Sequence, residues 1–365
     1  MFAERMNDVS PAPAFTLAPA IEPVADSWEG LVGGIGRTPS VPIEMRIGAR
    51  RCLLRLKLED RNPLGSIKDR TAYSLILAAE REHASGDTDG SPLTIVESTS
   101  GNMGAALAAM CRLRGHAMIA VVDPKTSLRN LALMEGYGAH VEMVDRPDET
   151  GCYLEARLAR VREICAAEDV YWTNQYANPA NPDIHFRLTG PEILDDVDGD
   201  IDCLFVAVST GGTLAGIARY LRLRRPRTAT RLIAVDAVGS VALNGVSAPR
   251  QITGYGAAHP SRFVNTADID GTEWVADADT VAICRRLTVE TGLCLGGSSG
   301  AVVAASVRYL NENPQLSRPV CLCPDGGLKY FESIYDDSWV RAHGIDVDRA
   351  LARYDAMRLH FSPLS

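Results

Sequence analysis

The sequence predicts an α/β protein built on mostly parallel sheets, and three observations lead to that prediction. Short apolar runs that do not alternate with polar residues recur along the chain, which is typical of strands covered by helices on both faces. Stretches with helical spacing separate these runs, and such alternation implies parallel strands joined by right-handed crossovers. At 365 residues the chain exceeds the usual single core, so we expect two closely packed lobes.

The expected elements follow one another from about Trp28 onward. Before that point, residues 1–27 contain several prolines and little periodicity, which indicates an irregular lead-in. Strands are expected at 53–58, 94–96, 118–122, 141–144, 204–208, 232–235 and 320–323. Helices are expected at 71–83, 102–114, 128–137, 154–168, 213–223, 279–290 and 300–311.

The composition is that of an ordinary globular protein, with 46% hydrophobic and 23% charged residues. A net charge of -9 argues against a nucleic-acid partner, because such binding needs concentrated Lys and Arg to neutralise phosphates. No apolar run is long enough to span a bilayer, and the N-terminus lacks the order of a secretory signal. We therefore expect a cytoplasmic protein with no membrane partner.

The nine cysteines are dispersed without C-x-x-C pairing, and several lie in apolar runs. This pattern indicates reduced thiols in a core. A zinc site would need Cys and His at closer, regular spacing, and the seven histidines are scattered singly. We expect no metal ligands among them.

A lysine stands just before one of the expected helices, in the segment Asn62-Pro-Leu-Gly-Ser-Ile-Lys68. Pro63 and Gly65 indicate a turn, so Lys68 falls at or near the helix start. There the helix dipole lowers the pKa of an amine toward the neutral form that imine chemistry needs. A single lysine is far more often a solvated surface residue, so this position alone is only suggestive.

A polar turn broken by glycine, Glu97-Ser-Thr-Ser-Gly-Asn-Met-Gly104, lies between the expected strand at 94–96 and the helix at 102–114. Backbone N–H groups and hydroxyls that converge at a helix N-terminus make an anion site suited to an amino-acid carboxylate. A capped strand-to-helix loop is the plain alternative, but capping accounts for only one of these hydroxyls.

The segment Ser209-Thr210-Gly211-Gly212-Thr213 also joins a strand to a helix. Its glycines allow close approach of the backbone, its hydroxyls add donors, and the helix dipole favours a dianion, so it suits a phosphate group. It matches neither the Walker loop nor the dinucleotide fingerprint, which argues against a generic nucleotide-binding role.

The segment Gly296-Gly-Ser298-Ser-Gly300 opens another expected helix. It is either a helix cap or a place where a hydroxyl meets the pyridine nitrogen of a bound cofactor. A hydroxyl, unlike an aspartate, would leave that ring neutral, and a neutral ring favours elimination at a β-carbon.

Together and in this order, these segments resemble the fold type II family of pyridoxal 5′-phosphate (PLP) enzymes, the group of cysteine synthases and cystathionine β-synthases. The resemblance spans roughly residues 28–340. It also includes Ile35-Gly-Arg-Thr-Pro39, Asn178-Pro-Ala-Asn-Pro-Asp-Ile-His185, Thr189-Gly-Pro-Glu192 and Pro324-Asp-Gly-Gly.

The resemblance implies a fold like that of the tryptophan synthase β-subunit, with two three-layer α/β/α lobes. A smaller, mobile lobe at about 90–190 is inserted in a larger lobe made of about 28–89 and 191–340, and a C-terminal extension occupies 341–365. The same likeness implies a homodimer. It gives no reason to expect a regulatory domain.

The resemblance also assigns roles to the segments. Lys68 becomes the lysine that carries PLP and shuttles the proton, while Asn102 contacts the phenolic oxygen and Ser298 the ring nitrogen. Ser209, Thr210, Gly211, Gly212 and Thr213 hold the phosphate. The carboxylate of the substrate is received by Thr99, Ser100, Met103 and Gln175.

The implied reaction is replacement of a group on the β-carbon of an activated L-serine, through an α-aminoacrylate. Within the family, stretches such as Tyr171-Trp-Thr-Asn-Gln-Tyr-Ala-Asn178 and Tyr335-Asp-Asp-Ser-Trp339 are similar to enzymes that join O-phospho-L-serine to L-glutamate. That reaction releases phosphate and gives N-(2-amino-2-carboxyethyl)-L-glutamate, a precursor of 2,3-diaminopropionate for siderophores or peptide natural products.

Three alternatives stay open at this point. In the first, the donor loses acetate rather than phosphate. In the second, the nucleophile is sulfide or thiosulfate, which would make cysteine or S-sulfocysteine. In the third, the chain is a regulatory homologue without catalysis, although Lys68, Asn102 and Ser298 are intact.

Overall fold

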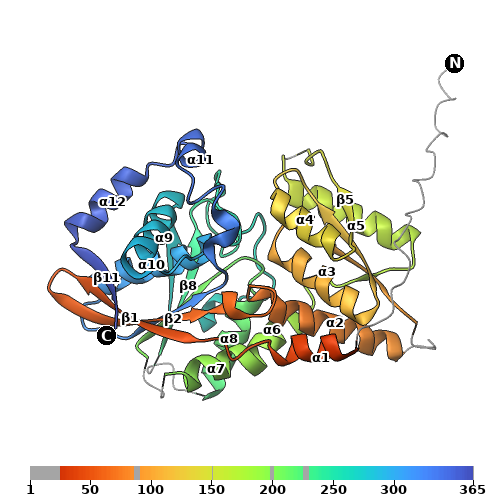
Figure 1. Cartoon of the computed structure of the whole chain (residues 1–365), viewed down its shortest axis with the longest axis horizontal. Coiled ribbons are helices and arrows are strands. Elements are labelled where there is room, and N and C mark those ends of the chain that lie inside the picture. The colour runs from red at the N-terminus through yellow and green to blue at the C-terminus, as the bar shows by residue number, and fades with distance from the viewer. Residues whose placement is uncertain (1–24, 86–90, 150, 198–200, 225–229, 365) are drawn as a thin grey trace.

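The structure is a computed structural model that describes residues 25–85, 91–149, 151–197, 201–224 and 230–364. Two sheets form its framework: Figure 1 shows the part with the larger sheet on the left and the part with the smaller one on the right. The strands are mostly parallel and are interleaved with helices, which confirms the predicted α/β class.

The larger sheet has seven strands in the order β11-β1-β2-β10-β7-β8-β9. From β2 to β9 neighbouring strands are parallel, while β1 pairs antiparallel with both β2 and β11. Their bounds are β1 Ser40–Ile47, β2 Arg50–Leu58, β7 Cys203–Ala207, β8 Arg231–Ala237, β9 Gly271–Val275, β10 Pro319–Cys323 and β11 Leu359–Pro363.

The smaller sheet has four parallel strands in the order β5-β4-β3-β6. Their bounds are β3 Thr94–Ser98, β4 Ala117–Val122, β5 His140–Met143 and β6 Tyr171–Trp172. Helices α2 (Lys68–Ala84), α3 (Asn102–Arg114) and α4 (Leu128–Gly136) contribute to the hydrophobic cluster on one face, and α5 (Tyr153–Ala167) packs on the other. This lobe therefore has three layers.

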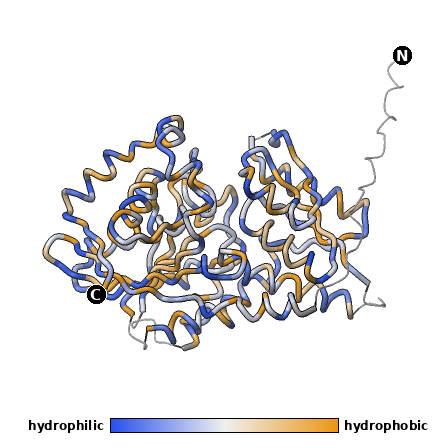
Figure 2. The backbone as a smooth tube through the Cα atoms, viewed as in Figure 1, coloured by the Kyte–Doolittle hydropathy of each residue, from blue (hydrophilic) through white to orange (hydrophobic). Residues whose placement is uncertain are grey.

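The larger sheet is likewise covered on both faces. Helices α9 (Asp277–Thr291) and α10 (Gly297–Glu312) bury their apolar residues in one cluster, and α7 (Gly190–Asp195) and α8 (Gly212–Arg224) in another. Figure 2 shows the strands as largely apolar segments between these layers. The remaining helices are α1 Ala25–Gly33, α6 Ala180–Ile184, α11 Asp337–Ala342 and α12 Val347–Ala356, with short turns η1 Glu59–Arg61, η2 His185–Thr189, η3 Thr266–Asp268 and η4 Gly327–Tyr330.

All seven predicted strands and all seven predicted helices are present in the structure, with small shifts at their ends. Four strands were not predicted: β1, β6, β9 and β11. In strand β1 the buried residues Ile43, Met45 and Ile47 alternate with more exposed ones. Only the face with the buried residues packs against the hydrophobic cluster that α9 and α10 also form. The search for non-alternating runs therefore missed it.

The two chain ends differ in what the structure describes. Most of the predicted lead-in, residues 1–24, lies outside the described residues, and α1 starts at Ala25, slightly before the predicted start of the fold. The predicted C-terminal extension supplies α12 and β11, and β11 adds an edge strand to the larger sheet beside β1. The extension is therefore part of the main core, where Phe361 is fully buried.

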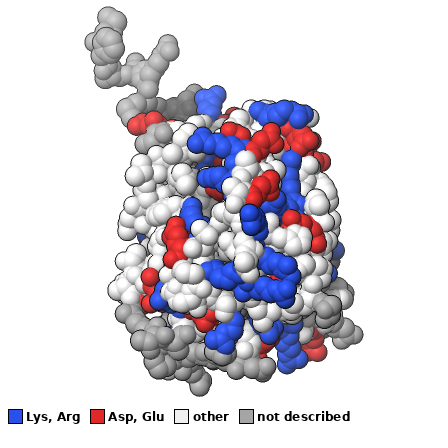
Figure 3. Space-filling model, turned by 90° about the vertical axis from the view of Figure 1, so that its left-hand side faces the viewer, with Lys and Arg blue, Asp and Glu red and all other residues white. Residues whose placement is uncertain are grey.

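On the face that carries β1, β11 and α12, acidic and basic side chains alternate (Figure 3). Many of them form ion pairs there, including Arg46 with Glu44 and Arg353 with Asp279. Within the part of the chain that the structure describes, no helix is long and apolar enough to cross a membrane.

Candidate active site

A cavity lies where loops from both sheets meet. It receives the segments that follow the carboxyl ends of β2, β7 and β10, together with the start of α3 from the smaller sheet. The carboxyl ends of parallel strands are the usual place for ligand sites in such sheets. The lining residues are Ile67, Lys68, Asn102, Val206, Ala207, Ser209, Thr210, Gly211, Thr213, Gly254, Ser298, Leu322 and Pro324.

Lys68 is the first residue of α2 and lines this cavity. Its turn is held by two hydrogen bonds: Ile67 N–H donates to the Pro324 carbonyl over 2.9 Å, and Lys68 N–H donates to Ser66 Oγ over 3.2 Å. Burial lowers the pKa of the Lys68 amine to about 8, against the opposing charge of Asp325. A substantial share of the amine is therefore neutral near physiological pH, as a nucleophile or proton acceptor requires.

The segment 209–213 forms a tight turn that leads into α8. Gly211 has φ +89°, and a Cβ at that position would come within 2.0 Å of Ser261 Oγ, so only glycine fits. Ser261 Oγ in turn donates to the Thr210 carbonyl over 2.7 Å. The turn thus presents backbone N–H groups and hydroxyls of Ser209, Thr210 and Thr213 to the cavity at a helix N-terminus, which suits a phosphate.

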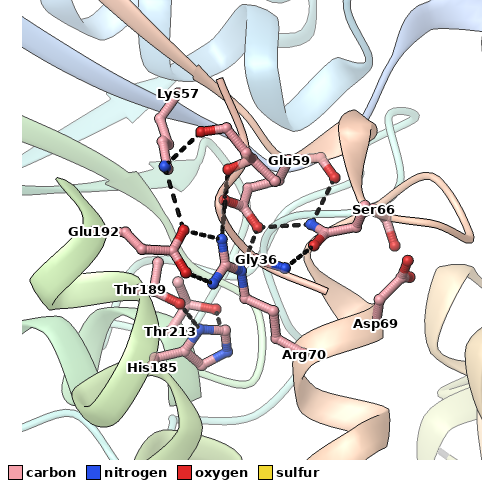
Figure 4. A network of polar contacts seen from close by, with 12 residues as sticks. Gly36, Lys57, Glu59, Ser66, Asp69, Arg70, His185, Thr189, Glu192 and Thr213 are labelled. Atoms are coloured by element: carbon pink, nitrogen blue, oxygen red, sulfur yellow. Dashed lines mark hydrogen bonds and ion pairs between the residues drawn. The ribbon is translucent and has the colours of Figure 1, made fainter. Parts of the chain in front are cut away.

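His185 lies directly behind this turn. Its Nε2 is 3.2 Å from Thr213 Oγ1 and 3.1 Å from Thr71 Oγ1, and its Nδ1 is 2.9 Å from Thr189 Oγ1 (Figure 4). Burial, helped by the nearby charges of Lys68 and Arg70, keeps the pKa of His185 well below its usual value. The imidazole is therefore neutral and fixes the Thr213 side chain without adding charge.

The segment 97–104 crosses from β3 into α3. Thr99 is buried and its N–H donates to the Val121 carbonyl over 3.0 Å, while the Ser100 carbonyl accepts from Asn130 over 3.2 Å. The N-cap of α3 is Gly101, which has no side chain to cap the helix, and the Gly104 N–H donates to the Gly101 carbonyl over 3.0 Å. The N–H groups of Asn102 and Met103 are therefore the ones that can bind an anion. The Met103 side chain packs into the hydrophobic cluster of the smaller lobe, which leaves only its backbone N–H for a ligand.

Gln175 is held against this segment. Its amide Nε2 donates to the Ser98 carbonyl over 3.0 Å, and its backbone N–H donates to Glu97 Oε2 over 3.0 Å. Glu97 also accepts from Thr173 Oγ1 over 2.7 Å and is fully buried. Burial raises the pKa of Glu97 to about 7, although these hydrogen bonds oppose the shift. Glu97 therefore connects the segment 97–104 to Gln175, the two parts of the predicted carboxylate site.

Ser298 lies in the first turn of α10 and is almost fully buried at the cavity wall. Facing it is Gly254, with φ +97°. A Cβ on Gly254 would stand 4.0 Å from Ser298 Oγ and 3.3 Å from the Tyr330 hydroxyl, so the missing side chain leaves room beside Ser298. Gly254 was not predicted, because one glycine in a turn such as Thr253-Gly-Tyr-Gly256 carries no specific signal.

Asn102 also lines the cavity and belongs to a small polar cluster. Its Nδ2 donates to Asp325 Oδ2 over 2.8 Å, and its Oδ1 accepts from Lys329 Nζ over 2.6 Å. The Tyr330 hydroxyl donates to the same Asp325 oxygen over 2.7 Å. The segment Pro324-Asp-Gly-Gly is part of the family resemblance, but the resemblance assigned no role to any of its residues.

A second polar network fixes the helix of Lys68 from the opposite side (Figure 4). Arg70 is fully buried between two carboxylates: its Nε is 2.7 Å from Glu59 Oε2 and its Nη1 is 2.7 Å from Glu192 Oε1. Glu192 also accepts from the backbone N–H of Arg37 over 2.9 Å, and buried Lys57 pairs with Asp196 over 2.7 Å. The network joins the entrance segment at 35–39, α2 and α7.

The structure thus brings ten predicted site residues to one place: Lys68, Asn102, Ser209, Thr210, Gly211, Thr213 and Ser298 line the cavity, and Gly212, Thr99 and Gln175 lie in segments directly behind it. Ser100 and Met103 belong to the same segment as Thr99, but none of these three is among the cavity-lining residues.

The chain matches the family model described as pyridoxal-phosphate dependent enzyme over residues 31–325. It is 45% identical, over 86% of its length and 91% of the relative, to N-(2-amino-2-carboxyethyl)-L-glutamate synthase of Ralstonia nicotianae. The protein of the same name from Cupriavidus metallidurans is 40% identical over 85% of this chain and 90% of its own.

Solved structures give the same picture of the fold. The crystal structure of O-ureido-L-serine synthase superposes with a TM-score of 0.75 at 29% identity, over 85% of this chain and 98% of that one.

Proposed function

The chain belongs to the family of pyridoxal-phosphate dependent enzymes, and from that premise we propose that it joins O-phospho-L-serine to L-glutamate, giving N-(2-amino-2-carboxyethyl)-L-glutamate and phosphate. The observation that carries this proposal is the 45% identity to a synthase of that name over 86% of the chain. The product would serve 2,3-diaminopropionate formation for a siderophore or a peptide natural product.

The residues of the cavity fit PLP. A partly neutral amine at Lys68, a glycine turn with hydroxyls and backbone N–H groups at 209–213, and a hydroxyl at Ser298 match an aldehyde, a phosphate and a pyridine nitrogen in turn. The space that Gly254 leaves beside Ser298 is where a Cβ would stand in the way of a flat ring. We propose that Lys68 carries the cofactor and that Ser209 to Thr213, Asn102 and Ser298 hold it.

When bound, PLP acts as an electron sink that makes the α-proton of an attached amino acid removable and lets a group leave its β-carbon. The protein supplies the rest. Lys68 accepts and returns the proton at Nζ, since its pKa of about 8 suits both tasks. The free N–H groups at the start of α3, with Thr99, Ser100 and the backbone of Met103, bind the substrate carboxylate, and Gln175 completes that site.

The donor and the nucleophile are tested together by a competition experiment. The purified protein with PLP is given O-phospho-L-serine or O-acetyl-L-serine, with glutamate, sulfide and thiosulfate present at equal concentrations, and the products are identified by mass. We expect the glutamate adduct from O-phospho-L-serine, with phosphate released in equal amount. Cysteine or S-sulfocysteine as the main product would reject the glutamate assignment and leave β-replacement standing.

The matched control is Lys68→Ala, which removes the amine and keeps the helix start. We expect product formation to fall by a factor of about a thousand or more, because both the covalent attachment and the proton shuttle are lost. A wild-type protein that takes up PLP yet makes no product from any donor would favour the regulatory homologue instead.

Three further features complete the proposal. The part of the chain at about 90–190, which holds the smaller sheet, would move over bound substrate and exclude water. The protein would be a cytoplasmic homodimer. Sedimentation of the full chain tests the dimer, and a change in its solution scattering on adding O-phospho-L-serine tests the movement.

A further inference from the structure

The orientation of the Asn102 amide is determined by its two charged neighbours. Lys329 Nζ can only donate, so the atom 2.6 Å from it must be the amide oxygen. An ionised Asp325 carboxylate can only accept, so the atom 2.8 Å from Oδ2 must be the amide nitrogen. One N–H of Asn102 is thus used by Asp325, and the other remains for a ligand in the cavity that Asn102 lines.

Asp325 is itself anchored to the other two walls of the cavity. Its carbonyl accepts from Ser299 Oγ over 2.8 Å and from the Gly296 N–H over 3.1 Å, at the start of α10. It also forms a β-bridge with Ser66, in the turn before Lys68. One residue therefore links the lysine turn, the Asn102 helix and the Ser298 helix.

The second oxygen of this carboxylate lacks a hydrogen-bond partner, as Asp60 Oδ1 and Asp69 Oδ1 also do among the described residues. Asp325 is 1% exposed, and among the described residues its Oδ1 has no hydrogen-bond partner. A buried carboxylate oxygen without a hydrogen-bond donor lowers the stability of the folded protein. The negative charge of Asp325 also acts on Lys68, where it favours the ammonium form.

We propose that Asp325 is a positioning residue that fixes the Asn102 amide and supplies the negative charge that stabilises a proton on Lys68. When Lys68 takes the α-proton of a substrate, its Nζ becomes an ammonium while the electron pair of the C–H bond stays with the substrate. An ammonium in a buried cavity needs a nearby negative charge. Asp325 supplies it without occupying the cavity.

This inference rests on the proposed role of Lys68 but not on the identity of the substrates. The titratable groups that act on Asp325 or respond to it are Lys68, Lys329, Asp60, Tyr330, Cys284 and Cys323. Any pH-dependent measurement must therefore follow Lys68 itself. Uptake of PLP does so, because only the neutral amine reacts with the aldehyde.

The test measures the rate of PLP uptake by the full chain freed of cofactor, from slightly acidic to strongly alkaline pH, with the attachment site identified by borohydride reduction and peptide mass. The variant Asp325→Asn keeps acceptors for Asn102 and Tyr330 but removes the charge. We expect the midpoint of the pH–rate curve to shift to lower pH by about one unit, since a nearby opposite charge shifts a pKa by roughly 1–3 units.

The matched control is Asp69→Asn. Asp69 follows Lys68 directly and is also buried, yet its Oδ2 accepts from the Leu64 N–H and it is not among the groups that act on Lys68. We expect this control to leave the midpoint unmoved. A folded Asp325→Asn variant with the wild-type midpoint, or equal shifts in both variants, would overturn the proposal, whereas PLP attached to a different lysine would overturn the role of Lys68 instead.

If Asp325→Asn does not fold, Tyr330→Phe decides the question. It keeps the charge of Asp325 but removes one of the two donors to Oδ2, so the carboxylate is less neutralised and acts more strongly on Lys68. The midpoint is then expected to move to higher pH by a fraction of a unit. No movement, or movement to lower pH, counts against the proposal.

Discussion

Two buried polar clusters flank Lys68, and they are satisfied to different degrees. On one side Arg70 lies between Glu59 and Glu192, and hydrogen bonds to both carboxylates use its Nε, Nη1 and Nη2 (Figure 4). On the other side Asp325 binds Asn102 and Tyr330 with Oδ2 alone, while Oδ1 lacks a partner among the described residues.

The difference separates a structural task from a chemical one. A buried charge with all its partners holds three segments in register, and it has no remaining capacity to respond to a ligand. A buried charge with an unused oxygen is less favourable for folding, but it still acts on groups in the cavity. The first cluster therefore positions the helix of Lys68, and the second determines the conditions in which Lys68 works.

The largest effect on stability is expected from Arg70→Met. The change leaves Glu59 and Glu192 without their cation, and breaking a buried ion pair in this way costs about 3–5 kcal/mol. Urea unfolding at neutral pH measures it. The control Arg114→Met removes an Arg–Glu pair that is partly exposed, where we expect a loss below about 1 kcal/mol. Equal losses in the two variants would contradict the distinction.

Glu97 sharpens the comparison, because it is a buried carboxylate with neutral donors only. Its pKa in the folded state is about 7, above the ordinary value of 4.5, so the folded protein binds this proton more tightly than the unfolded chain. Its contribution to stability therefore falls as pH rises from about 4.5 to about 7, by about 3 kcal/mol in all. The variant Glu97→Gln should lack this fall.

The measurement is the difference in free energy of unfolding between wild type and Glu97→Gln across that pH range. Glu80→Gln is a control of opposite sign. Glu80 bonds to His116 and Arg114, and these partners lower its pKa despite burial, so its contribution is lost as pH falls. If the difference in free energy of unfolding between wild type and Glu97→Gln does not change with pH, Glu97 is ionised over this whole pH range.

A smaller effect is expected from Lys329→Met. This change leaves the Asn102 carbonyl without its donor, which costs roughly 1–2 kcal/mol, and it frees the amide to turn over. Urea unfolding measures the loss of stability. The rate of PLP release from the holoprotein reports whether the Asn102 amide still keeps its orientation. Lys329→Gln can still donate to Asn102, so it should retain PLP better; similar release from both variants would mean that Lys329 does not orient the amide.

The smallest effect is expected from Arg129→Ala. Arg129 Nη1 donates to the Leu328 carbonyl over 2.8 Å, and this exposed contact connects α4 of the smaller lobe to η4 of the larger one. Exposed contacts of this kind contribute about 1 kcal/mol or less. A loss well above that value in urea unfolding would indicate that this contact is part of a larger network.

Much of the site could be predicted because its segments are local. Lys68, Ser209 to Thr213 and Ser298 each stand in a short turn between a strand and a helix, and the residue types of such turns record what the backbone must do there. Asp325, Lys329 and Gly254 were not predicted. Their roles depend on contacts with residues far away in the sequence, such as the contact between Asn102 and Asp325, whose residue numbers differ by 223.

The same division holds for the fold. Runs buried on both faces were found because they are apolar throughout: this holds for all of β7 and for the central part of β8, Leu232 to Val235. Strand β6 spans only Tyr171–Trp172, and β11 owes its place to pairing with β1 across the whole chain. Neither carries a local pattern that would distinguish it from a loop.

The sequence by itself determined the α/β class, the order of the elements and the glycine and hydroxyl turns that can hold an anion, because hydrophobic spacing and turn residues act over a few positions. Only the tertiary structure decided which buried charges are fully paired and that the carboxylate of Asp325 lies where its charge acts on Lys68. Pairing is a property of distances between remote side chains, and burial multiplies its consequences, because water no longer screens the charges that remain.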